Sequence, residues 1–357
     1  MIVGAFLVLA TSVSTPPETP EDFQKRVMPQ VVEQEPEPPE LSAEQLALRD
    51  ELRAIGESFD GISGIAVTQA SDLATVSHNG SAPFPQQSVS KLWVTMTALD
   101  QVDQGALSLD EMVTIRRDDL TVFHQPIRNI VKARGSFTSD YAELMERAIT
   151  QSDNTANDRL LRRVGGPQAV EAFLRRNRIS GVQFGTDERT KQSAIAGLEW
   201  RQAYSVGNAF YEARDNVSES DRRMAFEDYL ADPMDGATAT GMSEALARLA
   251  RGDLLSERST ELLLSTMEET RSGPRRLKGG VPEGWTIAHK TGTGQYFDGV
   301  QSGYNDVGIL TAPDGTQYAV AVLIGRTRSS YEQRFDMMQS VTRTVVRYHE
   351  EKVADVS

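Results

Sequence analysis

Apolar and polar residues near both ends of the sequence follow the pattern of β-strands. Apolar runs at residues 62–69 and 74–79 flank a short Ala-Ser-Asp turn, which predicts a hairpin. Further strand-like runs occupy residues 285–289, 307–311 and 318–324, and Ala-Pro-Asp-Gly joins the last two. We therefore expect strands from both ends of the chain to meet in one antiparallel sheet.

Helical patterns surround these strands. A helix is predicted over residues 41–58, because Ser42 and Gln45 form a capping-box-like start, and an amphipathic helix is predicted over 331–349. The segment between the two groups of strands is mostly helical in pattern, with short polar breaks. These elements predict an α+β fold of three layers (α/β/α), in which helices flank a five-stranded antiparallel sheet and an all-helical lobe of about residues 88–264 is inserted.

The N-terminal region differs in composition from the rest. Residues 1–14 contain an apolar run followed by small residues, which indicates a signal peptide or N-terminal anchor, although the usual Lys or Arg in front is missing. A misplaced start codon or a buried strand is the alternative. Residues 15–40 are rich in Pro and Glu and predict a disordered tether, so the catalytic domain is expected over 41–350.

Charge and cysteine content limit the classes of function. The chain has 357 residues, a formal net charge of −14 and no cysteine. A nucleic-acid partner is not expected, because such binding requires Lys and Arg to neutralise phosphates. An anionic small substrate stays compatible with this charge, since the local charge of a site can oppose the net charge. Disulfides and thiolate chemistry are excluded, and we expect a monomer.

The first candidate for chemistry is the pair Ser88 and Lys91, at the start of an apolar run with helical spacing. Pro83 and Pro85 disfavour an earlier helix start, so Ser88 is predicted in the first turn. Residues three apart share a helix face, which lets the Lys91 amine reach and activate the Ser88 hydroxyl. The alternative is a serine that merely caps the helix.

A second polar cluster, Ser152-Asp153-Asn154, interrupts two helix-like segments. A short break of this kind can present its side chains into a cleft. The alternative is an ordinary helix N-cap, because Ser, Asp and Asn are the preferred residues there.

The third cluster, Lys290-Thr291-Gly292-Thr293, follows a strand-like run directly. Lys290 can supply a cation for a substrate carboxylate, Thr291 a hydroxyl, and Gly292 a close approach to the backbone. If this strand faces the Ser88 helix, the N–H groups of Thr293 and Ser88 can converge on one oxyanion. The alternative is a glycine-rich strand end without a function.

The order of the three clusters along the chain resembles that of class A β-lactamases and penicillin-binding proteins. Further features of the class A pattern extend the resemblance over about residues 41–349. They are Phe84-Pro85, Gly165-Gly166-Pro167, Gly273-Pro274, Gly284-Trp285 and Tyr304-Asn305-Asp306.

This resemblance implies a serine β-lactamase that works through an acyl-enzyme. Ser88 would be the nucleophile, neutral Lys91 its base, and Ser152 the group that relays a proton to the departing ring nitrogen. Lys290 and Thr291 would hold the substrate carboxylate.

The remaining substrate contacts follow from the same resemblance. Asn154 would bind the acylamino side chain, and the Ser88 and Thr293 N–H groups would form the oxyanion hole. His124 occupies the place where the family usually has an aromatic wall; the alternative is a solvated loop histidine.

The base for deacylation is less well defined. The family's Glu-x-x-Leu-Asn pattern is absent, and Glu188 is the candidate glutamate in its place, with Asp187 as second choice. No Asn stands four positions after Glu188. The alternative is that Asp187, Glu188 and Arg189 form a surface ion-pair cluster, which would leave an enzyme that acylates but turns over slowly.

Residues 197–235 are additional to the usual class A pattern. Trp200, Tyr204, Gly207 and Tyr211 recur at helical spacing and predict a packed helix beside the loop, with a lid over the site as the alternative. Further cations for the carboxylate are expected among three arginines, which are Arg326, Arg328 and Arg334.

We therefore predict an exported serine β-lactamase with a small-molecule β-lactam substrate and no cofactor. A zinc enzyme is excluded because the chain lacks cysteine and its four histidines (His78, His124, His289 and His349) have no metal-ligand spacing. The alternatives are a D,D-peptidase or penicillin-binding enzyme, a related esterase, and a non-catalytic β-lactam sensor or peptidoglycan-binding module.

Overall fold

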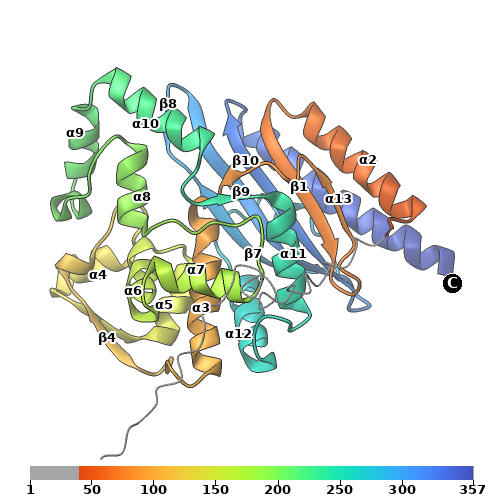
Figure 1. The fold of residues 1–357 in the computed structure, drawn as a ribbon, viewed down its shortest axis with the longest axis horizontal. Coiled ribbons are helices and arrows are strands. Elements are labelled where there is room, and N and C mark those ends of the chain that lie inside the picture. Colours follow the sequence, from red (N-terminus) through yellow and green to blue (C-terminus); the bar gives the residue numbers. More distant parts are fainter. Residues whose placement is uncertain (1–39, 357) are drawn as a thin grey trace, which may run out of the picture. The chain divides into compact units, whose positions relative to one another are not determined.

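An antiparallel sheet in the order β2-β1-β10-β9-β7 lies at the centre of the computed structural model, which describes residues 40–356 (Figure 1). This confirms the predicted five-stranded sheet, and a short β8 is added on β9. The predicted signal peptide or anchor (1–14) and nearly all of the predicted tether (15–40) lie outside the described residues. The strands are β1 (Gly61–Gln69), β2 (Thr75–His78), β7 (Thr286–Thr293), β8 (Tyr296–Phe297), β9 (Val300–Thr311) and β10 (Gln317–Thr327).

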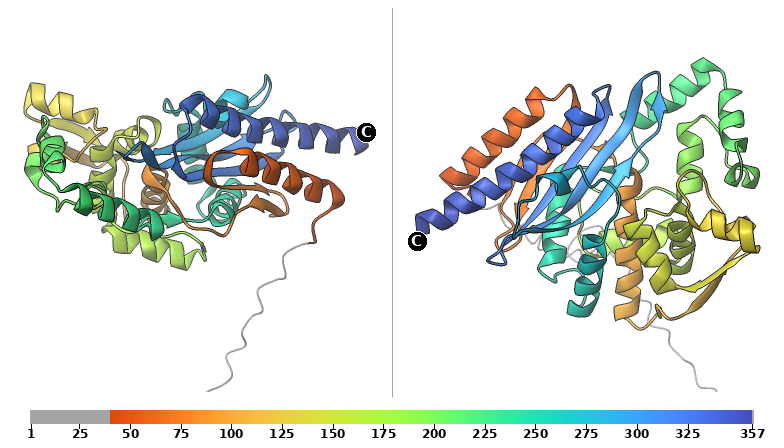
Figure 2. Two further views of the ribbon diagram at one scale, coloured as in Figure 1. Left: turned by 90° about the horizontal axis from the view of Figure 1, so that it is seen from above. Right: turned by 180° about the vertical axis from the view of Figure 1, so that it is seen from behind.

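Helices cover both faces of this sheet, as predicted. Figures 1 and 2 show α2 (Ala43–Ser58) and α13 (Tyr331–Val356) side by side across one face, and α11 (Ala239–Ala250) across the other. Successive side chains of β1 point to opposite faces of the sheet. Ile65 therefore packs with α2 and α13, while Ala66 packs with α11. No helix among residues 40–356 is long and apolar enough to span a membrane.

The capping box predicted at the start of the domain is present. Ser42 Oγ accepts from the Gln45 N–H at 3.2 Å, and Gln45 Oε1 accepts from the Ser42 N–H at 2.8 Å. Both bonds satisfy N–H groups that have no partner within the helix, and α2 begins at Ala43 for this reason.

The lobe beside the sheet differs in two respects from the all-helical lobe predicted over about residues 88–264. It carries a two-stranded ribbon of β4 (Met112–Ile115) and β5 (Phe137–Asp140). Its C-terminal part is also shorter, because α11 and α12 (Glu257–Glu268) pack against the sheet. The helices of the lobe are α3 (Lys91–Asp103), α4 (Ile127–Arg134), α5 (Tyr141–Thr150), α6 (Asn154–Val164) and α7 (Pro167–Arg176).

Helix α3 is the central helix of the domain. Every residue from Lys91 to Leu99 is buried, so the helix is enclosed on all sides, whereas the apolar spacing predicted one buried face. A 3₁₀ turn, η1 (Gln87–Ser90), leads into it. The candidate nucleophile, Ser88, therefore lies on a turn that is attached directly to a helix buried in the core.

The additional segment at residues 197–235 does not form the single packed helix that its aromatic spacing predicted. It contains η3 (Gln202–Ser205), α9 (Ala209–Asp215) and α10 (Glu219–Ala231). Gly207, with φ of 62°, breaks the pattern between η3 and α9. The segment follows α8 (Glu188–Ile195) in the chain, and Figure 1 shows α10 next to β8. Phe226 of α10 packs on Phe297 of β8.

Candidate active site

Ser88 and Lys91 are in direct contact at the start of α3. Lys91 Nζ donates to Ser88 Oγ at 2.7 Å, and the Lys91 side chain is 0% exposed. Ser88 itself is half-buried and lines a cavity. An amine so close to an accessible hydroxyl can take its proton, which is the arrangement that an activated serine requires.

The turn that carries Ser88 is held in an unusual conformation. Gln87 has a φ of 54°, in the left-handed region that costs a non-glycine residue about 1 kcal/mol or more. Its N–H donates to Asp235 Oδ2 at 2.9 Å, and its Nε2 donates to Tyr229 Oη at 2.7 Å and to the Ser302 carbonyl at 3.1 Å. Buried bonds to three residues that are distant in sequence thus fix the turn that carries the Ser88 hydroxyl.

The second cluster divides its roles between neighbouring residues. Asp153 caps α6 by accepting from the Thr155 and Ala156 N–H groups, at 2.8 Å and 3.1 Å. Ser152 has a left-handed φ of 58° and does not cap the helix. Its Oγ accepts from Lys290 Nζ at 3.0 Å. The helix-cap alternative thus describes Asp153 but not Ser152.

The third cluster runs along β7, the edge strand next to the Ser88 turn. A Cβ at Gly292 would lie 2.4 Å from the Gln86 carbonyl oxygen, so only glycine lets the strand pass this close. Lys290 is 0% exposed, and Thr291 Oγ1 lies 2.6 Å from Ser272 Oγ. The strand edge and the start of α3 therefore meet, as the sequence predicted.

These elements surround one cavity of about 490 Å³. The lining includes the Ser88, Ser152, Thr291 and Thr293 side chains, together with those of Asn154 and His124. Lys91 and Lys290 lie behind the lining and reach it through Ser88 and Ser152.

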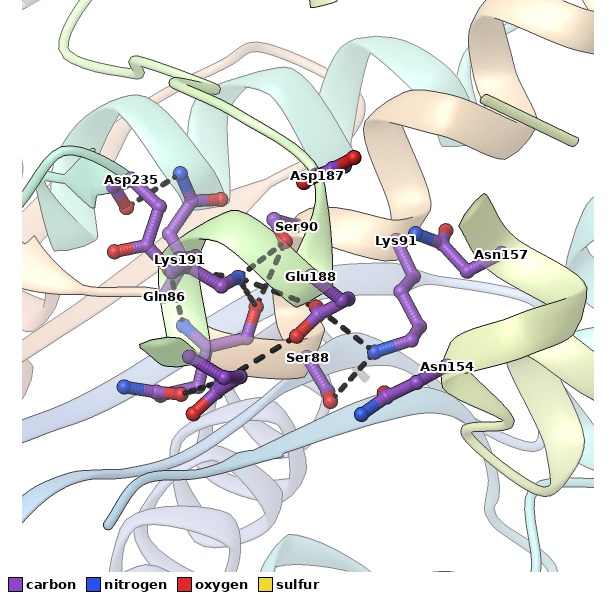
Figure 3. Close-up of polar contacts among 12 residues, drawn as sticks. Gln86, Ser88, Ser90, Lys91, Asn154, Asn157, Asp187, Glu188, Lys191 and Asp235 are labelled. Atoms are coloured by element: carbon purple, nitrogen blue, oxygen red, sulfur yellow. Dashed lines mark hydrogen bonds and ion pairs between the residues drawn. The ribbon is translucent and has the colours of Figure 1, made fainter. Parts of the chain in front are cut away.

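Glu188 and Ser88 both contact the Lys91 amine, as Figure 3 shows. Glu188 Oε1 is 3.0 Å from Lys91 Nζ, and the Glu188 side chain is 2% exposed, so it does not belong to a surface ion-pair cluster. Asp187, the second choice, caps α8 by accepting from the Thr190 N–H at 2.9 Å and lies apart from the Ser88–Lys91 pair (Figure 3).

Glu188 also contacts two residues that the sequence did not single out. Lys191 Nζ lies 3.2 Å from Glu188 Oε1 and 3.1 Å from Asp235 Oδ2 (Figure 3). Gln192 Nε2 donates to Glu188 Oε2 at 3.3 Å, so an amide does stand four positions after Glu188, on the same helix face. The four-residue spacing could have identified Gln192 from the sequence. The pairing of Lys191 with Asp235 could not be predicted in this way, because the two residues are far apart in the chain.

The buried charges shift one another's pKa values. Burial alone would raise the pKa of the Glu188 carboxyl, but Lys191 and Lys91 outweigh it and hold this pKa well below its usual range. Burial lowers the pKa of Lys91, against the opposing charge of Glu188. The site thus favours an ionised Glu188 beside a lysine that loses its proton more readily than a solvated one.

Arg276 is a further cation of the cavity that the sequence did not predict. Its Nη2 donates to Thr293 Oγ1 at 2.6 Å, its Nη1 donates to the Gly292 carbonyl at 2.9 Å, and its guanidinium lies 3.8 Å from the Tyr304 ring centroid. Burial, followed by the charges of Lys91 and Arg276, lowers the pKa of Lys290 well below its usual value. An anion bound here would relieve this repulsion.

The three arginines expected from the sequence are not in the cavity lining. Arg326 pairs with Glu227, and Arg328 lies 3.8 Å from Asp298. Arg334 is buried and donates to the Ser329 carbonyl at 2.7 Å. Arg326 lies in β10, Arg328 follows that strand directly, and Arg334 lies in α13.

His124 lies in the cavity wall beside Phe123. Its carbonyl accepts from the Asn154 N–H at 2.9 Å, and Phe123 has a left-handed φ of 61°. The place expected to hold an aromatic wall therefore contains both rings. Within residues 40–356, no three His, Asp or Glu side chains are grouped so as to hold a metal ion.

The buried carboxyl of Asp158, next to Glu188, should make the stability of the protein depend on pH. Its Oδ1 accepts from the Glu188 N–H at 3.1 Å. Burial, with the charges of Asp187 and Glu188, raises the pKa of Asp158 to about 7. In the unfolded chain the pKa of an Asp carboxyl is about 3.9. The stability that protonated Asp158 contributes to the fold is therefore fully present below about pH 4 and is lost as the pH rises through about 7.

We therefore expect Asp158→Asn to become more stable relative to the original protein as the pH rises. Asn stays neutral and keeps an oxygen for the Glu188 N–H, so the relative gain between pH 4 and pH 8 is about 4 kcal/mol, from about 1.4 kcal/mol per pKa unit. Urea unfolding at both pH values measures it. Asp110→Asn, at an exposed position, should change by less than about 0.5 kcal/mol. A pH-independent difference for Asp158→Asn contradicts the prediction.

The chain is similar to known proteins over most of its length. A family model described as "Beta-lactamase enzyme family" matches residues 47–349. The extended-spectrum beta-lactamase PER-1 of Pseudomonas aeruginosa is 29% identical over 320 residues, which cover 89% of this chain and 92% of that protein. Beta-lactamase VEB-1 of the same organism is 25% identical, over 80% of this chain and 85% of the relative.

Solved structures are similar over a comparable length. A beta-lactamase from Chitinophaga pinensis superposes with a TM-score of 0.68 and 27% identity, covering 84% of this chain and 98% of that one. The TLA-3 extended-spectrum beta-lactamase gives a TM-score of 0.69 at 23% identity, over 85% and 98% of the two chains, and supports the fold.

Proposed function

The chain belongs to the beta-lactamase enzyme family and is a class A β-lactamase-like serine hydrolase, and from this we propose the role of each residue in opening a β-lactam ring. The observation that carries the proposal is the continuous contact from Ser88 Oγ to Lys91 Nζ at 2.7 Å and from Lys91 Nζ to Glu188 Oε1 at 3.0 Å. This contact supports Ser88 as the nucleophile and Lys91 and Glu188 as the two candidate bases.

Acylation begins when Ser88 Oγ attacks the lactam carbonyl carbon and passes its proton to neutral Lys91. The negative charge that develops on the carbonyl oxygen is received by the Ser88 and Thr293 N–H groups. The carbon–nitrogen bond then breaks, and Ser152 donates its proton to the ring nitrogen. Ser152 is reprotonated by the proton that Lys91 took from Ser88, so Lys91 is neutral again, and Ser88 is left as an ester.

The substrate carboxylate binds at the cationic end of the cavity. Lys290, Thr291 and Arg276 converge there, and Gly292 lets the substrate approach the strand. Asn154 and His124 stand across the cavity, where Asn154 would bind the acylamino group. A carboxylate among a buried lysine and a buried arginine gains charge-assisted hydrogen bonds.

Deacylation needs a water activated by Glu188. The carboxylate accepts a proton from water, the water oxygen attacks the ester carbonyl carbon, and the bond to Ser88 Oγ breaks. Ser88 Oγ takes up the proton that Glu188 accepted from water, so Glu188 is ionised again, and the product leaves with an open ring. Gln192 and Lys191 keep the Glu188 carboxylate in place during this step.

Steady turnover of nitrocefin by the purified protein tests the function. We expect many molecules of nitrocefin to be hydrolysed per protein molecule. One equivalent followed by a stable covalent adduct would instead indicate a β-lactam sensor. Release of D-alanine from a cell-wall pentapeptide mimic, without nitrocefin turnover, would indicate a D,D-peptidase.

We also propose that the enzyme acts as a monomer without a metal ion and is exported to the periplasm or the medium. The composition of residues 1–14 and 15–40 supports an export segment followed by a tether to the domain at 41–350. N-terminal sequencing of the protein recovered from a periplasmic extract tests the export proposal.

A further inference from the structure

A second arginine of the cavity lining comes from the additional segment and is partly exposed. Arg214, near the end of α9, is among the lining residues, and its side chain is 19% exposed. Within the described residues its Nε has no hydrogen-bond acceptor. Its nearest carboxylate is that of the adjacent Asp215, 3.8 Å away and 69% exposed, which is a weak partner.

The charges around Arg214 leave it available for a ligand. Glu188 is the acidic residue of the cavity lining, and Lys91 and Lys191 already contact its carboxylate. Glu212 of α9 is exposed and does not line the cavity. Burial, followed by the charge of Arg214, lowers the pKa of the neighbouring Arg222, against the opposing charge of Asp215.

Aromatic packing fixes α9 at the cavity. The buried ring of Phe210 lies 4.9 Å from the Phe123 ring, centroid to centroid, in an edge-to-face contact. Tyr211 lies 6.1 Å from both rings, lines the cavity, and carries the Arg214 guanidinium 5.1 Å above its own ring. The guanidinium is thus presented next to an exposed aromatic surface.

We propose that Arg214 and Tyr211 of α9 form a subsite for β-lactams whose acyl side chain carries a carboxylate next to an aromatic ring. The inference rests on the proposed function, in which Lys290, Thr291 and Arg276 hold the carboxylate of the ring nucleus. A second guanidinium at the same cavity, on a different element, then fits a second carboxylate. The aromatic ring of such a side chain packs on Tyr211.

Benzylpenicillin and carbenicillin provide a matched test, because they differ by one carboxylate on the carbon next to the phenyl ring. We expect Arg214→Gln to lower the ratio of kcat/KM for carbenicillin to that for benzylpenicillin by at least about 10-fold, as a lost hydrogen bond to a charged group predicts. Arg214→Lys should retain part of the preference. Both substrates are measured on one preparation, so partial loss of folded enzyme cancels in the ratio.

Arg201→Gln is the matched control, because Arg201 is an exposed arginine of the same segment outside the cavity lining. It should leave the ratio unchanged. If Arg201→Gln lowers the ratio as much as Arg214→Gln, distant charge and not contact sets the preference, and the subsite is refuted. An unchanged ratio in Arg214→Gln also refutes it, whereas no turnover of benzylpenicillin by the original protein refutes the proposed function itself.

Discussion

Ser88→Ala removes both β-lactam turnover and the covalent adduct, with a fall in kcat of at least about 10⁴-fold. The reason is that the Ser88 oxygen is the atom that bonds to the substrate, and Lys91 alone, 0% exposed behind it, cannot reach the carbonyl. The fold should persist, because Ser88 Oγ is held by one bond from Lys91 and is half-buried. Nitrocefin turnover and intact mass after incubation with benzylpenicillin measure the two losses.

Ser90→Ala is the comparison for this variant. Ser90 stands on the same 3₁₀ turn and donates to the Gln87 carbonyl at 2.8 Å, so its loss costs about 1 kcal/mol of stability. We expect this variant to keep the adduct and the turnover. A covalent adduct that forms on Ser88→Ala at the original rate would show that another residue is the nucleophile.

The features predicted well from sequence are those that local chemistry determines. The capping box at Ser42 and the pair Ser88 and Lys91 depend on residues three apart, and the structure has both contacts. Ser152 and Lys290 are far apart in sequence, and their meeting was expected because the order of the clusters resembles a known family.

Features that depend on distant partners were missed. Lys191 was not singled out, because its partner Asp235 stands at the far end of the additional segment and neither residue has a local signal. Arg276 was missed for the same reason, as its bonds go to the strand backbone and to Thr293. Strand β9 begins seven residues before its predicted start, since its first half contains Gln301, Ser302 and Asn305, which are buried polar residues without the apolar pattern of a strand.

The additional segment shows how an apolar spacing can mislead. Trp200, Tyr204 and Tyr211 are spaced as on one helix, yet they pack with Phe210 as a cluster between η3 and α9. Apolar side chains at helical spacing indicate only that these side chains are buried together. A folded loop can bury them together as well as a helix can. The glycine at position 207 was the contrary signal.

Glu188→Gln separates the two halves of the reaction, and we expect the acyl-enzyme to accumulate. General-base catalysis contributes about 10²- to 10⁴-fold, so deacylation should slow by that factor. Acylation should continue, because loss of the Glu188 charge removes a group that favours protonated Lys91 and so leaves more of this amine as a neutral base. Intact mass during turnover of benzylpenicillin measures the adduct, and single-turnover kinetics give the two rates.

Asp187→Asn is the matched control, since it neutralises the adjacent carboxylate that caps α8. Asn is also a good N-cap, so this variant should remain folded and keep its deacylation rate. In the original enzyme, Lys191 and Lys91 hold the pKa of Glu188 below its usual range, so deacylation should stay fast at pH 5, with the base still ionised. Equal deacylation rates in Glu188→Gln and the original enzyme, or a slow rate in Asp187→Asn alone, would transfer the role of base from Glu188 to another group.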